Sequence, residues 1–259
     1  ASDVYKRQDA SYNLRYGDFK ARISGYYTRI YDQSKVISYY DDVAATFTNF
    51  AMSGIDKVHF GLEAAVSIPI YHTLALNGAV SWGQYTYDSN PYYLQTQDNS
   101  GDIVSDGYVY WKDFRVESTP QTAVNVGLSW RSNNNIYLSA DFNYYNNMYL
   151  SMSPIYRTDA VITGGMAPGD IEHLRRQEKF DSAYTLNASI GKNWYIHRKY
   201  TLGFSLDVKN ILNNQDIKTG GYEQTRLSKN TETTVTTYQA FDSKYFYMFG
   251  TTYYLNLYF

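Results

Sequence analysis

Histidines and carboxylates are the first side chains to examine for chemistry in this chain. The four histidines are His59, His72, His173 and His197, and no two of them have the spacing of metal ligands. His59 and Glu63 lie four residues apart in a run that alternates like a β-strand, so both face one side of it. We interpret them as polar side chains that contact water. No metal site, cofactor site or catalytic residue is predicted, and we expect no enzymatic activity.

Two shorter motifs also have simple interpretations. Asn187-Ala188-Ser189 fits a glycosylation sequon, but it lies inside a predicted strand, so we interpret the match as chance. The charged run over 170–179 has a composition compatible with a helix, and Glu172 stands four residues before Arg176, where their charges can pair. We predict a solvated helix in a loop, with contact to a partner as the alternative.

Aromatic residues between the predicted strands are the candidates for ligand contact. Rings with a polar edge suit stacking on sugar rings or flat ligands. The simpler interpretation is that these rings pack the loops together or form an outer aromatic girdle. The candidate ligand contacts are Tyr39, Tyr40, Tyr92, Tyr93, Tyr108, Tyr110 and Trp111.

Strict alternation of apolar and polar residues defines the elements that position these side chains. From Tyr184 to Trp194 the even positions are mostly apolar and the odd positions are small and polar. A period of two predicts a β-strand with one apolar and one polar face. Nine such runs lie near 9–16, 18–30, 55–69, 72–87, 120–131, 134–150, 181–194, 199–212 and 245–259.

The links between these runs alternate between tight turns and long loops. The long loops are expected near 31–54, 88–119, 151–180 and 213–244. Loops of this length are uncommon in compact soluble domains. Short turns on one rim and long loops on the other are typical of outer-membrane β-barrels, in the periplasm and outside the cell respectively. The sequence therefore predicts an all-β, antiparallel transmembrane β-barrel.

Composition agrees with this fold class and excludes others. The chain has 30 Tyr and an aromatic fraction of 18%, while its charged fraction of 19% is below the ~25% usual for soluble domains. No run approaches the ~20 apolar residues of a membrane-spanning helix. The net charge of −2 provides no basic footprint for nucleic acid. The absence of cysteine rules out a disulfide framework and thiolate metal sites.

Residues 1–8 fit no strand pattern, and we expect a non-native or disordered leader there. The barrel segment is then expected over 9–259. Nine strands is an odd number, whereas single-chain bacterial barrels have even numbers. We therefore expect the chain to be a part of a larger barrel. The alternatives are a small self-contained barrel that acts as a passive pore or anchor, and a soluble extracellular β-sandwich that binds a ligand.

The C-terminal third resembles a known family. Asp207-Val208-Lys209-Asn210-Ile211-Leu212-Asn213 is similar to the "V-x-N-L-F-N" signature of TonB-dependent outer-membrane receptors, and it ends a predicted strand in Asn-rich turn chemistry. Ser118-Thr119-Pro120 is similar to the family's "T-P" strand opening. The segments 219–224 and 244–247 look like the Bacteroidetes branch, closest to the receptors that carry a carboxypeptidase-regulatory-like domain.

The resemblance implies the C-terminal part of a 22-stranded barrel in the outer membrane of a Gram-negative bacterium. The implied function is TonB-energised uptake of a bulky nutrient such as a siderophore or a glycan, for which this chain supplies barrel wall and capture loops. The implied partners are membrane lipid, an N-terminal plug domain of the same protein, TonB acting through that plug, and a surface lipoprotein lid. Phe259 ends the last strand, as in the signal that the barrel-assembly machinery recognises.

Overall fold

The structure is a computed structural model that describes residues 4–42, 45–98, 100–117, 119–163, 172, 175–197, 199–230 and 237–259. An 11-stranded antiparallel sheet dominates it, and nine of its strands follow one another in sequence order. The predicted all-β, antiparallel class is confirmed. The nine strands are β1 (Val4–Tyr16), β2 (Phe19–Asp41), β3 (Thr46–Tyr71), β4 (Leu74–Tyr87), β7 (Thr122–Arg131), β8 (Ile136–Asn146), β9 (Ala183–Ile196), β10 (Tyr200–Lys209) and β15 (Thr252–Tyr258).

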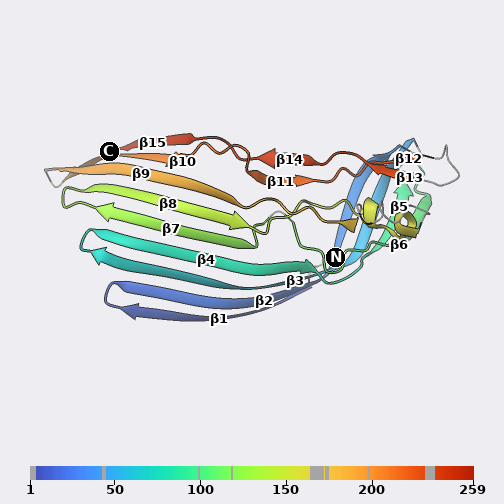
Figure 1. Ribbon diagram of the computed structural model, residues 1–259, viewed down its shortest axis with the longest axis horizontal. Coiled ribbons are helices and arrows are strands. Elements are labelled where there is room, and N and C mark those ends of the chain that lie inside the picture. Colours follow the sequence, from blue (N-terminus) through green and yellow to red (C-terminus); the bar gives the residue numbers. More distant parts are fainter. Residues whose placement is uncertain are drawn as a thin grey trace.

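Four tight turns lie together at one end of this sheet, and the longer connections lie at the other end, as Figure 1 shows. The turns join β1 to β2, β3 to β4, β7 to β8 and β9 to β10. Gly17, Asn135 and His197 have φ values of 58°, 58° and 51° there, a left-handed conformation that glycine and asparagine tolerate best. The four predicted tight links are present, and so are the predicted long links near 88–119, 151–180 and 213–244.

The prediction of a loop over 31–54 is wrong. β2 continues to Asp41 and β3 begins at Thr46, so the two strands form one long hairpin of 23 and 26 residues. Their register shifts between Ile30 and Gln33 and again between Gln33 and Lys35, beside Asp32 with a φ of 53°. A bulge reverses which side of the sheet each following residue faces. Because the bulges interrupt the alternation of apolar and polar residues, the sequence pattern did not reveal the end of β2 or the start of β3.

The expectation of a disordered leader over 1–8 is also wrong for the described residues 4–8. β1 begins at Val4, which pairs with Tyr31, and the register stays regular up to Tyr16 opposite Phe19. The extension of β2 supplies the backbone partners for these residues. All five side chains are exposed, and three consecutive ones, Lys6, Arg7 and Gln8, are polar, so the segment carries no alternation of hydrophobicity.

The other long connections contain short elements of their own. β5 (Tyr92–Gln97) adds to the edge of β3, and β6 (Ile103–Tyr108) pairs with β5. Between β8 and β9 lie a 3-10 helix, η1 (Ile155–Arg157), and α1 (Asp159–Thr163). The last predicted run is two strands, because β14 (Lys244–Tyr247) pairs with β11 (Lys218–Tyr222) and only β15 joins the main sheet. β12 (Leu227–Asn230) pairs with β13 (Thr237–Ala240).

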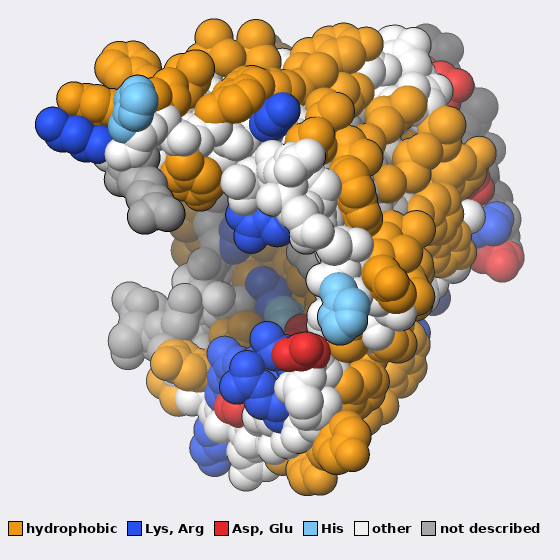
Figure 2. All heavy atoms as spheres, turned by 90° about the vertical axis from the view of Figure 1, so that its left-hand side faces the viewer, with side chains coloured by type: hydrophobic (Ala, Val, Ile, Leu, Met, Phe, Trp, Pro, Cys, Tyr) orange, Lys and Arg blue, Asp and Glu red, His pale blue; other side chains and the backbone are white. Residues whose placement is uncertain are grey.

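The main sheet is an open, curved wall in the described part of the chain. β1 pairs only with β2, and β15 pairs only with β10. Seen from the end with the tight turns, the wall encloses a deep hollow that is open on one side (Figure 2). Among the described residues, no helix is long and apolar enough to cross a membrane.

The hydrophobic core lies among the long connections and not along the wall. Its buried side chains come from the second half of β2, the first half of β3, the end of β4, from β5, and from the segments before β7 and after β8. The core consists of Tyr39, Phe50, Met52, Ile55, Tyr87, Tyr93, Val109, Trp111, Met152, Ile155, Tyr156 and Val161. These strand ends and the connections beyond them form one packed unit, which we call the loop cluster. It lies at the end of the wall that is opposite the tight turns (Figure 1).

Candidate functional site

The wall has a convex face of exposed apolar side chains. Strand pairing places these residues opposite one another across the sheet: Leu62 pairs with Trp82, Val126 with Phe142, and Leu202 with Trp194. Figure 2 shows hydrophobic side chains over most of the outer surface of the curved wall. Exposed members from most of the wall strands are Leu14, Ile23, Leu62, Val80, Val126, Phe142, Ile190, Leu202 and Leu255.

The concave face carries the opposite positions of the same strands, and these are polar. Asn125 donates a hydrogen bond from Nδ2 to Oδ1 of Asn143 at 2.9 Å, and the hydroxyls of Ser139 and Ser189 lie 2.7 Å apart. These bonds run from strand to strand and satisfy the polar groups within the wall. Lys and Arg side chains gather in the hollow that this face lines (Figure 2). The two faces predicted from alternation are observed in strands such as β7, β8, β9 and β10.

Tyrosine rings on the concave face lie across glycines of neighbouring strands. A Cβ atom at Gly191 would collide with the ring of Tyr137, and one at Gly203 would collide with the ring of Tyr258. A ring that covers a glycine protects the exposed backbone there and fixes the register of the two strands. These positions need glycine because of the ring above them.

Three of the candidate ligand-contact residues are core residues instead. Tyr93 and Trp111 are each 1% exposed, and Tyr39 is also buried. The ring of Tyr93 stacks on Phe50 with 4.6 Å between centroids, and that of Trp111 packs on Tyr87 at 4.7 Å. The prediction that these three contact a ligand is wrong, because they pack the loop cluster together.

The other four candidate residues are exposed on the outside of the loop cluster. Tyr92 and Tyr108 pair across β5 and β6, with their rings edge to face at 5.6 Å, and the Tyr92 hydroxyl donates a hydrogen bond to the carboxylate of Asp106. Tyr40 lies elsewhere, against Phe47, and Tyr110 lies under the guanidinium of Arg175. The four rings do not form one platform, and their role in ligand contact stays a prediction.

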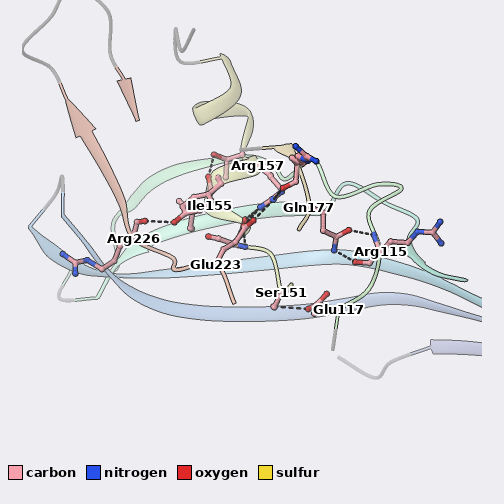
Figure 3. Close-up of polar contacts among 12 residues, drawn as sticks. Arg115, Glu117, Ser151, Ile155, Arg157, Gln177, Glu223 and Arg226 are labelled. Atoms are coloured by element: carbon pink, nitrogen blue, oxygen red, sulfur yellow. Dashed lines mark hydrogen bonds and ion pairs between the residues drawn. The ribbon is translucent and has the colours of Figure 1, made fainter. Parts of the chain in front are cut away.

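A buried ion pair, the Arg157 clamp, holds the loop cluster together. Arg157 is 0% exposed, and its guanidinium meets the Glu223 carboxylate twice, with Nη1–Oε2 at 2.5 Å and Nη2–Oε1 at 2.9 Å (Figure 3). The same guanidinium donates to the carbonyls of Ser153 at 3.1 Å and Arg176 at 3.3 Å. Glu223 also accepts the Ser153 backbone N–H at 2.8 Å. The clamp thus joins two long connections, and no sequence signal distinguishes its two residues.

An exposed ion pair connects the β2–β3 hairpin to the same region. Arg226 holds Asp42 through Nε–Oδ2 at 2.8 Å and Nη2–Oδ1 at 2.7 Å, and its carbonyl accepts the hydroxyl of Tyr156. The hydrogen bonds from Arg226 hold the pKa of Asp42 below its usual value. Burial raises the pKa of Tyr156 to about 12. These contacts tie residues that are far apart in the sequence.

Two other residues singled out from the sequence, His59 and Asn187, have structural contacts. The His59 ring packs on Tyr85 at 4.7 Å, and Oδ1 of Asn187 accepts the Asn210 backbone N–H at 2.9 Å. His173 lies outside the described residues, as do residues 170, 171 and 174 of the 170–179 run. In that run the Arg176 N–H donates to the Glu172 carbonyl at 3.1 Å, and no ion pair joins their described side chains. Within the described ranges, no three metal-ligating side chains come together.

The Asn-rich turn after β10 is confirmed. Asn210 and Asn213 have φ values of 51° and 52°, and Asn210 Nδ2 donates to the carbonyls of Asn214 and Phe249, each at 3.0 Å. Thr251 donates its backbone N–H to Asn213 at 3.0 Å, so the turn also fixes the start of β15. Phe259 follows β15 and is exposed, and its role in assembly stays a prediction.

No family model matches this chain, and no curated protein or solved structure matches it.

Proposed function

We propose that the chain forms part of the wall of a TonB-dependent β-barrel in the outer membrane of a Gram-negative bacterium. The observation that carries this proposal is the convex face, where strand pairing aligns exposed apolar side chains from β1 to β15. Exposure of apolar area to water raises the free energy by roughly 25 cal/mol for each Å². A lipid bilayer removes that penalty, while the polar concave face contacts water in the lumen.

A soluble β-sandwich is a weaker explanation of the same face. A sandwich buries its apolar side chains against a second sheet about 10 Å away. In the described ranges, no second sheet covers Leu62, Val126 or Leu202, and each of them is exposed. A complete small barrel is also weaker, because β1 and β15 do not pair with each other.

The two open edges support a place within a larger barrel. Unpaired edge strands promote association, and barrels remove them by closure. β1 and β15 would pair with the remaining strands, and the concave face would surround the plug domain. The loop cluster stands beyond the apolar wall, where it would meet a bulky nutrient and a surface lipoprotein lid. Energy would reach the barrel from TonB through the plug.

Membrane fractionation of the native full-length protein tests this proposal. The protein is expected to sediment with the outer membrane and to stay there after a wash with alkaline carbonate. Uptake of its nutrient is expected to stop when TonB is deleted. Release into the soluble fraction would contradict the proposed location. Uptake that continues without TonB would contradict the proposed energy source.

A further inference from the structure

A cavity of about 640 Å³ lies on the concave face near the tight turns. Strand pairing puts two rows of side chains around it. One row runs from Arg15 through Lys20 and Ser67 to Asn77, and the other runs from Asn13 through Arg22, Ala65 and Ala79 to Asn125. Small side chains thus form the floor between long basic side chains on one side and amides on the other.

The charges around this cavity are of one sign. Arg15, Lys20 and Arg22 all line it, and no carboxylate lines it. Within the described part of the chain, none of these three cations is in an ion pair, whereas Arg7 on the same face of β1 lies 3.7 Å from Asp9. All three are exposed and can reach a solute. Unpaired cations on a concave surface attract anions and concentrate them there.

We propose that this cavity binds a small solute with two or more anionic oxygens, such as a polycarboxylate or a polyphosphate. Guanidinium groups bind carboxylate and phosphate oxygens with paired, charge-assisted hydrogen bonds. Asn77 and Asn125 add amide donors from the opposite side of the floor. The guanidiniums of Arg15 and Arg22 and the ammonium of Lys20 provide the charge.

The size of the cavity favours one small ligand over a polypeptide. Its volume falls within the roughly 300–1,000 Å³ typical of small-molecule sites. A second cavity of about 330 Å³ continues along the concave face, shares Arg22 and Asn125 with the first, and carries Glu63. The carboxylate of Glu63 therefore marks the limit of the positively charged region around Arg15, Lys20 and Arg22. An acidic chain that followed the concave face would meet repulsion from Glu63.

The anion site deepens the proposed function, and its role in transport rests on that function. A transporter wall with this site would hold an anionic nutrient on the concave face near the tight-turn rim, where the wall meets the plug domain. Binding itself depends only on the cavity and its three cations.

Calorimetric titration of the full chain in a neutral maltoside detergent at low salt tests the inference. The probes are inorganic pyrophosphate, citrate and uncharged sucrose. One equivalent of pyrophosphate or citrate is expected to bind, more weakly as salt rises, and sucrose is expected not to bind. Arg22→Gln is expected to weaken anion binding at least about tenfold, because it removes charged hydrogen bonds. Arg7→Gln is the matched control and is expected to leave binding unchanged.

Three results would overturn the inference. They are the failure of both anions to bind the folded wild-type chain, an equal loss of binding in Arg7→Gln and Arg22→Gln, and binding of sucrose as tight as that of the two anions. Circular dichroism reports whether each variant folds, and Lys20→Gln replaces Arg22→Gln if the latter does not. A chain that inserts into lipid but binds no anion contradicts this inference alone. A chain that binds anions but stays out of lipid contradicts the proposed function alone.

Discussion

Removal of one partner of the Arg157 clamp is expected to loosen the loop cluster. In Arg157→Met the apolar replacement leaves the Glu223 carboxylate with the backbone N–H of Ser153 but without its cation. The Glu223 side chain is only 12% exposed, so water replaces the lost partner poorly. Breaking a buried pair in this way costs about 3–5 kcal/mol. Replacement of both residues, in Arg157→Met with Glu223→Leu, is expected to restore most of this stability.

Hydrogen exchange at single amides measures this change, because it reports local opening separately from global unfolding. The Tyr110 amide donates to the Arg157 carbonyl at 2.8 Å and is the reporter. Its protection is expected to fall by about 100-fold or more in Arg157→Met, following the cost of a broken buried pair. Arg226→Gln, which breaks the exposed pair with Asp42, is the matched control and is expected to change protection little. Equal effects of the two changes, or no recovery in the double variant, would refute the role of burial.

Three further changes have expected outcomes. Gly203→Val forces a side chain into the ring of Tyr258, and we expect a loss of about 1–3 kcal/mol and faster exchange along β15, measured by the same method. Alkali is expected to loosen the loop cluster. An unfolded Tyr releases its proton near pH ~10, whereas folded Tyr156 keeps its proton up to about pH 12. The free energy of unfolding is therefore unaffected by this group below pH ~10 and falls by up to roughly 3 kcal/mol above it. A fluorescence titration that stays flat over this range would contradict the raised pKa of Tyr156. Because Arg226 lowers the pKa of Asp42, the ion pair between them is present above the ordinary carboxyl pKa of ~4 and is lost as the pH falls below it. A spin-label distance between the segments that carry Asp42 and Arg226 is expected to increase in acid, and a constant distance would contradict the loss of the pair.

The strands of the wall could be predicted from the sequence because their alternation depends only on residues close together in the chain. Alternation in strands such as β9 and β10 follows from the two-residue period of a strand, which puts apolar side chains on one face and polar side chains on the other. Turn residues such as Asn210 also act locally, through their own side-chain hydrogen bonds. The bulge beside Asp32 broke the alternation and concealed the second half of the β2–β3 hairpin.

The interior of the loop cluster could not be predicted in the same way. Arg157 and Glu223 are 66 positions apart, and nothing near either residue marks it as a partner of the other. Trp111 and Tyr93 are residue types that often bind ligands, and only their tertiary packing identifies them as core residues. The cations of the concave cavity come together through strand register, which alternation alone does not specify.

Neighbouring positions on β7 report whether the convex face contacts lipid. The chain has no cysteine, so Leu128→Cys and Ser129→Cys each provide a single attachment site for a polarity-sensitive fluorophore. Leu128 is on the convex face and Ser129 is on the concave face. In vesicles of brominated lipid the label at position 128 is expected to be quenched and that at 129 to remain bright. Equal quenching at the two positions, or none at either, would contradict lipid contact through the convex face.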